Sequence, residues 1–185
     1  MKEQTNLRDI LKKGVLADEL DLERALILDR KLRLIVKEHP ELAEDRRKLR
    51  LIIKAYEKKN WTSATDITDK QIKESDDAEF IAEQERKFLE IRKQAIKKSL
   101  ADKNMTQQDL AILLGHSKSY MSELMNGISP FSNRDLIIIH RLFNIELEYL
   151  ISTIISQKDK EKLKESINKL NKPALKLVKG DLVFV

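Results

Sequence analysis

The sequence predicts an all-α protein with a small β-hairpin at its C-terminal end. Glycine and proline are scarce, at four and three among 185 residues, and 36% of the residues are charged. This composition, rich in leucine, isoleucine, lysine and glutamate, is typical of helical proteins. Apolar residues also recur at three- and four-residue spacing in several separate segments, which indicates amphipathic helices packed on a shared core.

The same composition excludes several classes of protein. No apolar run approaches the roughly 18 residues of a membrane-spanning helix, and the polar N-terminus lacks the apolar core of a signal peptide. Cysteine is absent, so neither disulfides nor thiolate metal sites can form. We therefore expect a cytoplasmic protein that does not interact with membranes.

Residues 1–59 are predicted to form a helical hairpin that mediates dimerisation or partner binding. Asp21 is a candidate cap for a helix that continues to His39, where Pro40 suits the start of a second helix. One apolar stripe marks the second helix: Leu49, Ile52, Ile53 and Tyr56. The first helix has more apolar residues than one stripe requires: Leu28, Leu32, Leu34, Ile35 and Val36. This surplus favours a dimer interface or a partner groove over self-contained packing.

Residues 60–85 are predicted to be an acidic linker. Two lysines stand against eight aspartates and glutamates there, a net charge of −6 in a chain whose total is +5. Residues 60–77 have little apolar content and no clear period, which is typical of a loosely held connection. The parts of the chain on either side are mildly basic, which invites an anionic partner such as nucleic acid.

Helical patterning continues through residues 86–155, a second predicted domain. One inward face is expected to hold Phe88, Ile91, Ala95 and Ile96, with Arg92 largely elsewhere. Residues 128–132, ISPFS, are predicted to be a polar loop. Ser132 and Asp135 then form a candidate capping box for the next helix.

Residues 156–185 are predicted to be a C-terminal tail. A lysine- and glutamate-rich helix is expected from about residue 158 to residue 170. Branched residues flank a Lys-Gly-Asp sequence in residues 174–185, which predicts a β-hairpin. Because two strands alone are marginal in water, the hairpin is expected to pair with this chain, a second copy or a partner.

The stretch TQQDLAILLGHSKSYMSELMNG, residues 106–127, has the pattern of two short helices joined by a tight turn. Thr106 with Asp109 can cap the first helix, Gly115 can end it, and Ser117 can cap the second. With only Gly115 and His116 between them, the helices must cross steeply, as in a helix-turn-helix unit. The expected inner faces comprise Leu110, Ala111, Leu114, Met121, Leu124 and Met125. The outer face of the second helix stays polar and suits a DNA major groove.

Residues from about 92 to 151 resemble the Cro/C1 repressor family of helix-turn-helix domains. The matching segments are TQQDLAILLG, SKSYMSELMNG, RDLIIIHRLFNI and EYLI. The resemblance implies a five-helix lambda-repressor-like domain that binds a double-stranded DNA operator. It implies a phosphate contact for Gln107, and base reading by Lys118, Ser119 and Glu123. The residues that it places near the DNA backbone are Ser117, Tyr120, Ser122 and Asn126.

Two of these side chains keep a second interpretation. Glu123 could accept a hydrogen bond from a cytosine amine or pair with a lysine on the recognition helix. Tyr120 could reach a phosphate or only shield the edge of the core. Many Cro/C1 members carry basic residues after the Asn-Gly, where this chain has ISPFS. Fewer phosphate contacts release fewer counterions, so affinity is expected to depend on dimerisation.

The overall organisation, a helical N-terminal segment ahead of a Cro/C1 domain, is similar to HigA-like antitoxins. That similarity implies a homodimer that represses its own operon and binds a small ribonuclease toxin through its N-terminal helices. Two alternatives stay open: a free-standing repressor without a toxin, and an interaction adaptor that does not read DNA.

The sequence offers no enzyme, cofactor or metal site. His39, His116 and His140 lie far apart and lack the spacing of a zinc hydrolase. There is no glycine-rich phosphate loop and no nucleophile motif. Asp76 and Asp77 are better explained as solvated acidic residues than as a catalytic pair.

Overall fold

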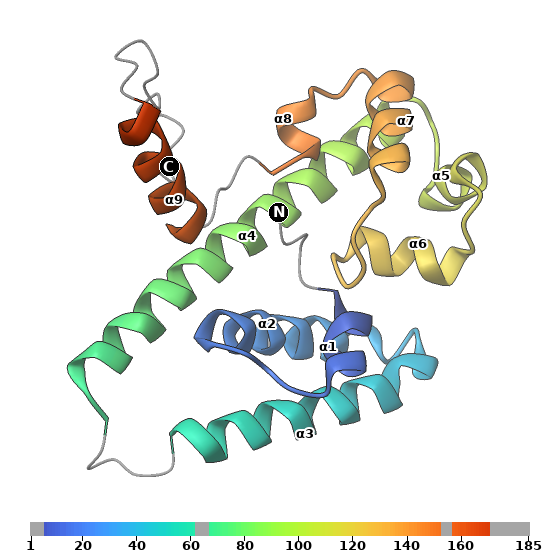
Figure 1. The fold of residues 1–185 in the computed structure, drawn as a ribbon. Coiled ribbons are helices and arrows are strands. Elements are labelled where there is room, and N and C mark those ends of the chain that lie inside the picture. Colours follow the sequence, from blue (N-terminus) through green and yellow to red (C-terminus); the bar gives the residue numbers. More distant parts are fainter. Residues whose placement is uncertain (1–5, 62–66, 153–156, 171–185) are drawn as a thin grey trace. The chain divides into compact units, whose positions relative to one another are not determined.

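The computed structural model describes residues 6–61, 67–152 and 157–170. The chain divides into two compact units, residues Met1–Leu150 and Ile151–Val185. The described residues form helices and contain no strand (Figure 1). In chain order these are α1 (Leu7–Lys13), α2 (Glu19–Ile35), the 3-10 turn η1 (Pro40–Leu42), α3 (Ala43–Asn60), α4 (Asp69–Asp102), α5 (Gln107–Leu114), α6 (Lys118–Met125), α7 (Asn133–Phe143), α8 (Leu147–Leu150) and α9 (Gln157–Leu170).

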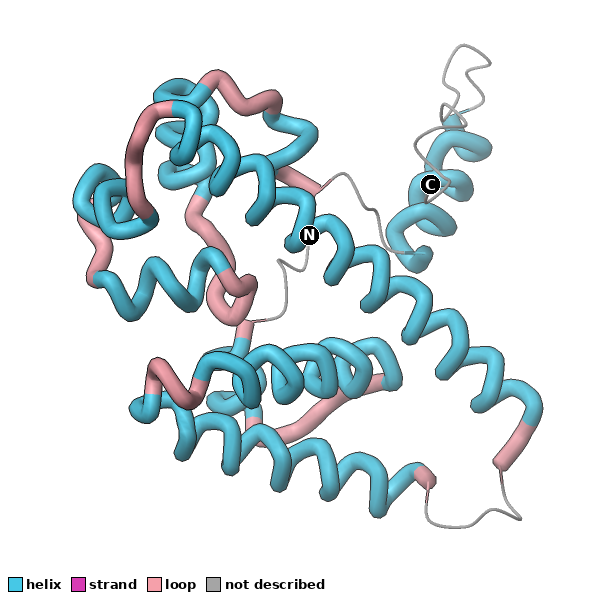
Figure 2. The backbone as a smooth tube through the Cα atoms, turned by 180° about the vertical axis from the view of Figure 1, so that it is seen from behind, coloured by secondary structure: helices cyan, strands magenta, loops and turns pink. Residues whose placement is uncertain are grey.

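The predicted N-terminal hairpin is present as α2 and α3, and α1 adds a short helix that the sequence pattern did not predict (Figure 2). Asn6 caps α1 by accepting a hydrogen bond from the backbone of Arg8. Leu7 and Ile10 of α1 are buried, and they close a core that includes Leu28 and Leu32. The predicted surplus of apolar residues on α2 is therefore largely core.

The stripe predicted on α3 is confirmed. Leu49 and Ile53 are buried, while Ile52 and Tyr56 pack partly buried against the same core. The exception among the apolar residues predicted on α2 is Leu34, whose side chain is 72% exposed. It is one of the few large apolar side chains that the N-terminal helices leave uncovered.

The prediction of a loose acidic linker is wrong from Asp69 onward, because this segment begins the 34-residue helix α4. Thr68 and Gln71 form a capping box at its start. The buried residues on the inner side of this part of α4 are small: Ala78 and Ala82. Arg24 of α2 binds the carboxylate of Glu85 with two hydrogen bonds, one of them 2.8 Å long. A helix held by alanines and ion pairs lacks the bulky apolar stripe by which helices are usually recognised.

The inward face predicted for the second half of α4 is wrong at two neighbouring positions. Ile91 is 51% exposed, whereas Arg92 is buried and takes its place on the inner side. The guanidinium of Arg92 lies over the rings of Phe88 and Phe131, and it donates to the backbone carbonyl of Leu150 at 3.5 Å. Burial lowers the pKa of Arg92 to about 10. The long aliphatic stem and the aromatic partners explain how a cation can occupy this position.

The second half of α4 and helices α5 to α8 enclose the second core of the unit, with Ile96, Leu110, Met121, Ile139 and Leu150 at its centre. These five helices are consistent with the predicted all-α helix-turn-helix fold. Ser132 and Asp135 form the predicted capping box of α7. The predicted C-terminal helix is α9, whereas the β-hairpin expected in residues 174–185 lies outside the described residues. Among the described residues, no helix is both long and apolar enough to cross a membrane.

Candidate nucleic-acid interface

Helices α5 and α6 begin and end at the caps that the sequence predicts. The hydroxyl of Thr106 accepts from the backbone of Asp109 at 3.2 Å, and the Asp109 carboxylate accepts from the backbone of Thr106 at 2.7 Å. The Asp109 carboxylate accepts from both the backbone N–H and the hydroxyl of Thr106, and these two bonds lower the pKa of Asp109 below its usual value. Gly115 ends α5 in the left-handed region, with φ of +75°. Ser117 caps α6 by accepting from the backbone of Tyr120 at 3.2 Å.

The inner faces of the two helices are those expected. Every residue predicted to face inward is at most 3% exposed: Leu110, Ala111, Leu114, Met121, Leu124 and Met125. Ala111 on α5 is small enough to let α6 cross closely, and its carbonyl accepts from the backbone of His116 in the turn. The helix-turn-helix geometry therefore follows from packing and capping together.

His116 anchors this turn to α7 through a contact that the sequence did not reveal. Its Nε2 lies 3.1 Å from the carboxylate of Asp135, and its ring meets the ring of Tyr120 edge-on at 5.1 Å. Arg134 donates to the carbonyl of Leu114 at 3.3 Å, which satisfies the end of α5. Asp135 thus has two tasks, as the capping-box residue of α7 and as the partner of His116. The capping box was visible in the sequence, but the contact with His116 depends on the fold.

The residues predicted to contact DNA gather on α6 and its caps, with Gln107 as the first residue of α5. Ser117 and Lys118 are exposed, so the start of α6 presents a hydroxyl and a cation to solvent. Glu123 is buried, at 8% exposed. The other predicted contact residues are half-buried: Gln107, Ser119, Tyr120, Ser122 and Asn126. Their roles toward DNA stay predictions.

Glu123 forms an ion pair, but its partner is not a lysine of its own helix. The carboxylate accepts from Arg8 of α1 at 3.3 Å and from the hydroxyl of Ser129 at 2.9 Å. The prediction of a lysine partner is therefore wrong. Arg8 lies 115 residues earlier in the chain, and no local spacing could reveal it.

Other polar residues of α6 also have partners. The hydroxyl of Ser119 donates to the carboxylate of Glu41, at the N-terminal turn η1, over 2.6 Å. The guanidinium of Arg8 lies 5.3 Å from the centre of the Tyr120 ring. Lys93 of α4 donates to the side-chain oxygen of Asn126 at 2.8 Å. Several predicted DNA contacts are thus already engaged within the chain.

The ISPFS segment is a loop, as predicted, but it is largely buried and not the polar surface loop that was expected. Ile128, Ser129 and Phe131 are buried, and Ile128 belongs to the core formed by the N-terminal helices. The backbone N–H of Leu7 donates to the carbonyl of Ile128 at 3.4 Å. Packing against α1 accounts for an apolar residue at a position where many Cro/C1 members are basic.

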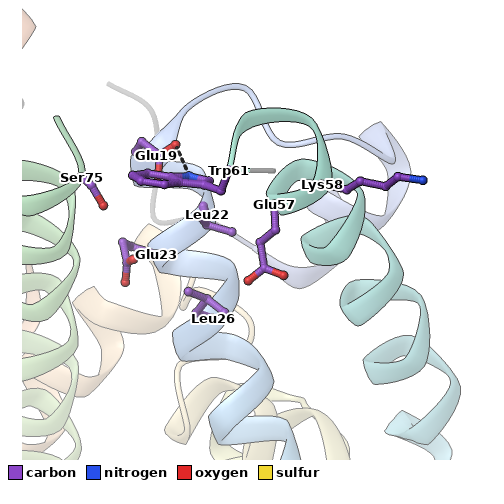
Figure 3. A pocket seen from close by; sticks show the side chains of 8 residues that line it. All are labelled: Glu19, Leu22, Glu23, Leu26, Glu57, Lys58, Trp61 and Ser75. Carbon is purple, nitrogen blue, oxygen red and sulfur yellow. Dashed lines mark hydrogen bonds between the residues drawn. The ribbon is translucent and has the colours of Figure 1, made fainter. Parts of the chain in front are cut away.

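Away from α6, the N-terminal helices border an open pocket of about 650 Å³ (Figure 3). Leu22, Leu26 and Trp61 supply its apolar surface. Glu19 accepts hydrogen bonds from the hydroxyl of Tyr56 at 2.9 Å and from the indole of Trp61 at 3.1 Å. The other lining residues are Glu23, Glu57, Lys58 and Ser75. With three carboxylates, this pocket is a poor surface for DNA phosphates.

Burial is the main reason that the pKa of Glu23 is raised, and Glu79 adds to it. Among the described residues, no group of three or more His, Asp or Glu side chains could hold a metal ion.

Residues 96–150 match the family model described as helix-turn-helix. No curated protein and no solved structure matches the chain. The matched segment covers the end of α4 and all of α5 to α8, so it contains the capped pair α5–α6 described above. Residues 96–150 are therefore similar to helix-turn-helix domains, a class found in DNA-binding regulators.

Proposed function

We propose that this protein is a sequence-specific transcriptional regulator that binds operator DNA as a homodimer. The observation that carries the proposal is the capped α5–α6 pair, in which α6 begins with the exposed residues Ser117 and Lys118. A recognition helix in a helix-turn-helix unit contacts base edges with its N-terminal residues. Repression would follow because a bound dimer blocks access to the promoter.

The side chains divide into two groups in this proposal. Lys118 donates to guanine or to a phosphate, and Ser119 contacts a base edge. Gln107, at the start of α5, holds a phosphate together with residues on the flank of α6: Ser117, Tyr120, Ser122 and Asn126. Glu123 can accept from a cytosine only after Arg8 has moved away from it.

Dimerisation would place two recognition helices in successive major grooves, about 34 Å apart. Support comes from large apolar side chains that the helix-turn-helix domain leaves exposed: Ile112, Leu113, Ile137, Leu142, Leu147 and Tyr149. Exposed apolar residues at this density suit self-association. A dimer also compensates for the phosphate contacts that are lost because ISPFS stands where many Cro/C1 members have basic residues. Two half-sites double the number of phosphate contacts.

An antitoxin role, with autorepression of a toxin–antitoxin operon, is the more specific form of this proposal. The supporting observation is the acidic pocket of Glu19, Glu23 and Glu57 around an apolar floor. A ribonuclease binds a polyanion and needs a basic surface for it, which an acidic pocket complements. A toxin of this class would then bind the N-terminal helices while α6 serves the operator.

An interaction adaptor is the second candidate. The observation in its favour is that Ser119 and Glu123 are already bound to Glu41 and Arg8. In an adaptor these contacts would be permanent, and α6 would never meet a base pair.

Selection from a random double-stranded DNA pool separates the two candidates. The full chain is compared with Lys118→Ala and with Lys54→Ala, which removes the same charge from an exposed position of α3. A regulator enriches a palindrome with half-sites one helical turn apart. Lys54→Ala should enrich the same sequence, and Lys118→Ala should not. If the wild type enriches nothing at low salt, the regulator proposal fails and the adaptor stands.

A further inference from the structure

Three residues of α6 are contacted by the N-terminal helices, and all three are predicted to meet DNA. Arg8 contacts Glu123 and the ring of Tyr120, and Glu41 accepts from Ser119. We propose that α1 and η1 form an intramolecular cover over the DNA-reading side of α6, which must lift before the operator can bind. This inference rests on the proposed function, because it concerns the same helix.

The covered residues share one side of the helix. Ser119 and Glu123 are four residues apart, so they are neighbours along the surface of α6. Lys118 and Ser122 form the adjacent row, in which Lys118 is exposed and Ser122 half-buried. The cover therefore leaves the row with Lys118 partly open to an approaching phosphate, while it occupies the row that would read bases. An encounter with DNA and full insertion into the groove become separate steps.

Glu41 places a negative charge where DNA would place one. Its carboxylate accepts from Ser119, the second residue of α6, near the helix end that favours anions. The hydrogen bond from Ser119 is the main cause that lowers the pKa of Glu41, and the backbone and His39 contribute. The carboxylate is therefore ionised at neutral pH. It competes with a phosphate for the same donor and repels one nearby.

The contacts of the cover are of a kind that can open. Arg8 keeps 62% of its side-chain surface in solvent, and the hydrogen bond between Glu41 and Ser119 is exposed. Exposed polar contacts are individually weak. By contrast, Ile128 is buried in the N-terminal core directly after α6. This apolar contact tethers α1 close to the end of α6, so α1 stays nearby when the polar contacts of the cover open.

The test is a titration of the DNA selected by the wild type with Glu41→Ala and with Arg8→Ala/Glu41→Ala. Because only the open fraction binds, weakening the cover raises apparent affinity. We expect binding about threefold to tenfold tighter. Glu38→Ala is the matched control, because it removes the same charge from an exposed site three residues away. Equal affinities for Glu41→Ala and Glu38→Ala would overturn the cover, as would weaker binding by the double variant.

Hydrogen exchange of the full chain, alone and bound to the selected DNA, gives an independent test. The cover predicts that the amides of residues 7–13, His39, Glu41 and Leu42 exchange faster in the complex. Unchanged or slower exchange there would overturn it. Failure of the proposed function looks different: no variant, including the wild type, would bind any DNA more tightly than Lys118→Ala does.

Discussion

The carboxylate of Glu123, on the helix predicted to read DNA, lies 3.3 Å from the guanidinium of Arg8 at the start of the chain. Glu123 keeps 11% of its side-chain surface in solvent and Arg8 keeps 62%, so the pair joins a buried acceptor to a solvated donor. The energy of this contact bears on both proposals, because it holds the N-terminal helices against α6.

We predict that Arg8 and Glu123 are energetically coupled. A double-mutant cycle with Arg8→Ala and Glu123→Gln, followed by urea unfolding, should give a coupling energy of about 0.5–1 kcal/mol. The magnitude is modest because Arg8 is largely solvated. A matched cycle with Arg50→Ala, an exposed arginine of α3, should give none. Additive effects of Arg8→Ala and Glu123→Gln would show that the pair contributes nothing to the contact.

Gly127 should tolerate an added side chain poorly. Its φ is +65°, and an added Cβ would lie 2.9 Å from Cδ1 of Leu89 on α4. Gly14 is a matched control, since its φ is +70° and nothing lies within 4 Å of its Cβ position. We expect Gly14→Ala to cost about 1 kcal/mol from backbone strain alone, and Gly127→Ala about 1–3 kcal/mol more. Equal losses in urea unfolding would mean that Leu89 can move aside at little cost.

The sequence predicts the helix-turn-helix unit well because the relevant forces are local. Capping boxes such as Thr106–Asp109 and the left-handed glycine at residue 115 act within a few residues. It fails where distant residues decide. The helix at residues 69–85 is stabilised by Arg24, which lies far away in the sequence and binds the carboxylate of Glu85. Arg92 can be buried because its guanidinium lies over the ring of Phe131. The partners of Glu123 and Ser119 come from α1 and η1, and the burial of Ile128 depends on the N-terminal core.

Lys31 should make stability depend on pH. Burial, together with the nearby cations Lys93, Arg86 and Arg92, lowers the pKa of Lys31 to about 8. The unfolded chain therefore binds more protons than the native state between about pH 8 and the ordinary lysine pKa, and stability rises with pH across this window.

The replacement Lys31→Met should raise stability at pH 7 by on the order of 1–3 kcal/mol, and this gain should shrink by pH 9.5. Lys54→Met, at an exposed site of α3, should change neither the free energy of unfolding nor its dependence on pH. The measurement is urea unfolding at pH 7, 8.5 and 9.5. A gain that does not vary with pH would contradict the lowered pKa of Lys31.

Asp135 should be the more important of the two capping-box aspartates in the helix-turn-helix domain. It is 2% exposed, and its carboxylate accepts from the backbone N–H of Ser132 in the capping box of α7 and binds His116, whereas Asp109 belongs to an exposed capping box. Asp135→Ala should cost about 2–4 kcal/mol, because it leaves the turn and a helix start without partners. Asp109→Ala should cost clearly less. Similar losses in thermal or urea unfolding would show that the contact with His116 adds little.

Titration of the selected operator by wild type, Lys118→Ala and Lys54→Ala tests most directly whether α6 reads DNA. At fixed salt we predict that Lys118→Ala weakens binding about tenfold to a hundredfold, as expected when one base or phosphate contact is lost at the recognition helix. Lys54→Ala should bind like the wild type. If both variants weaken binding equally and slightly, the protein is attracted to DNA only by its net charge, and α6 is not the helix that reads the bases.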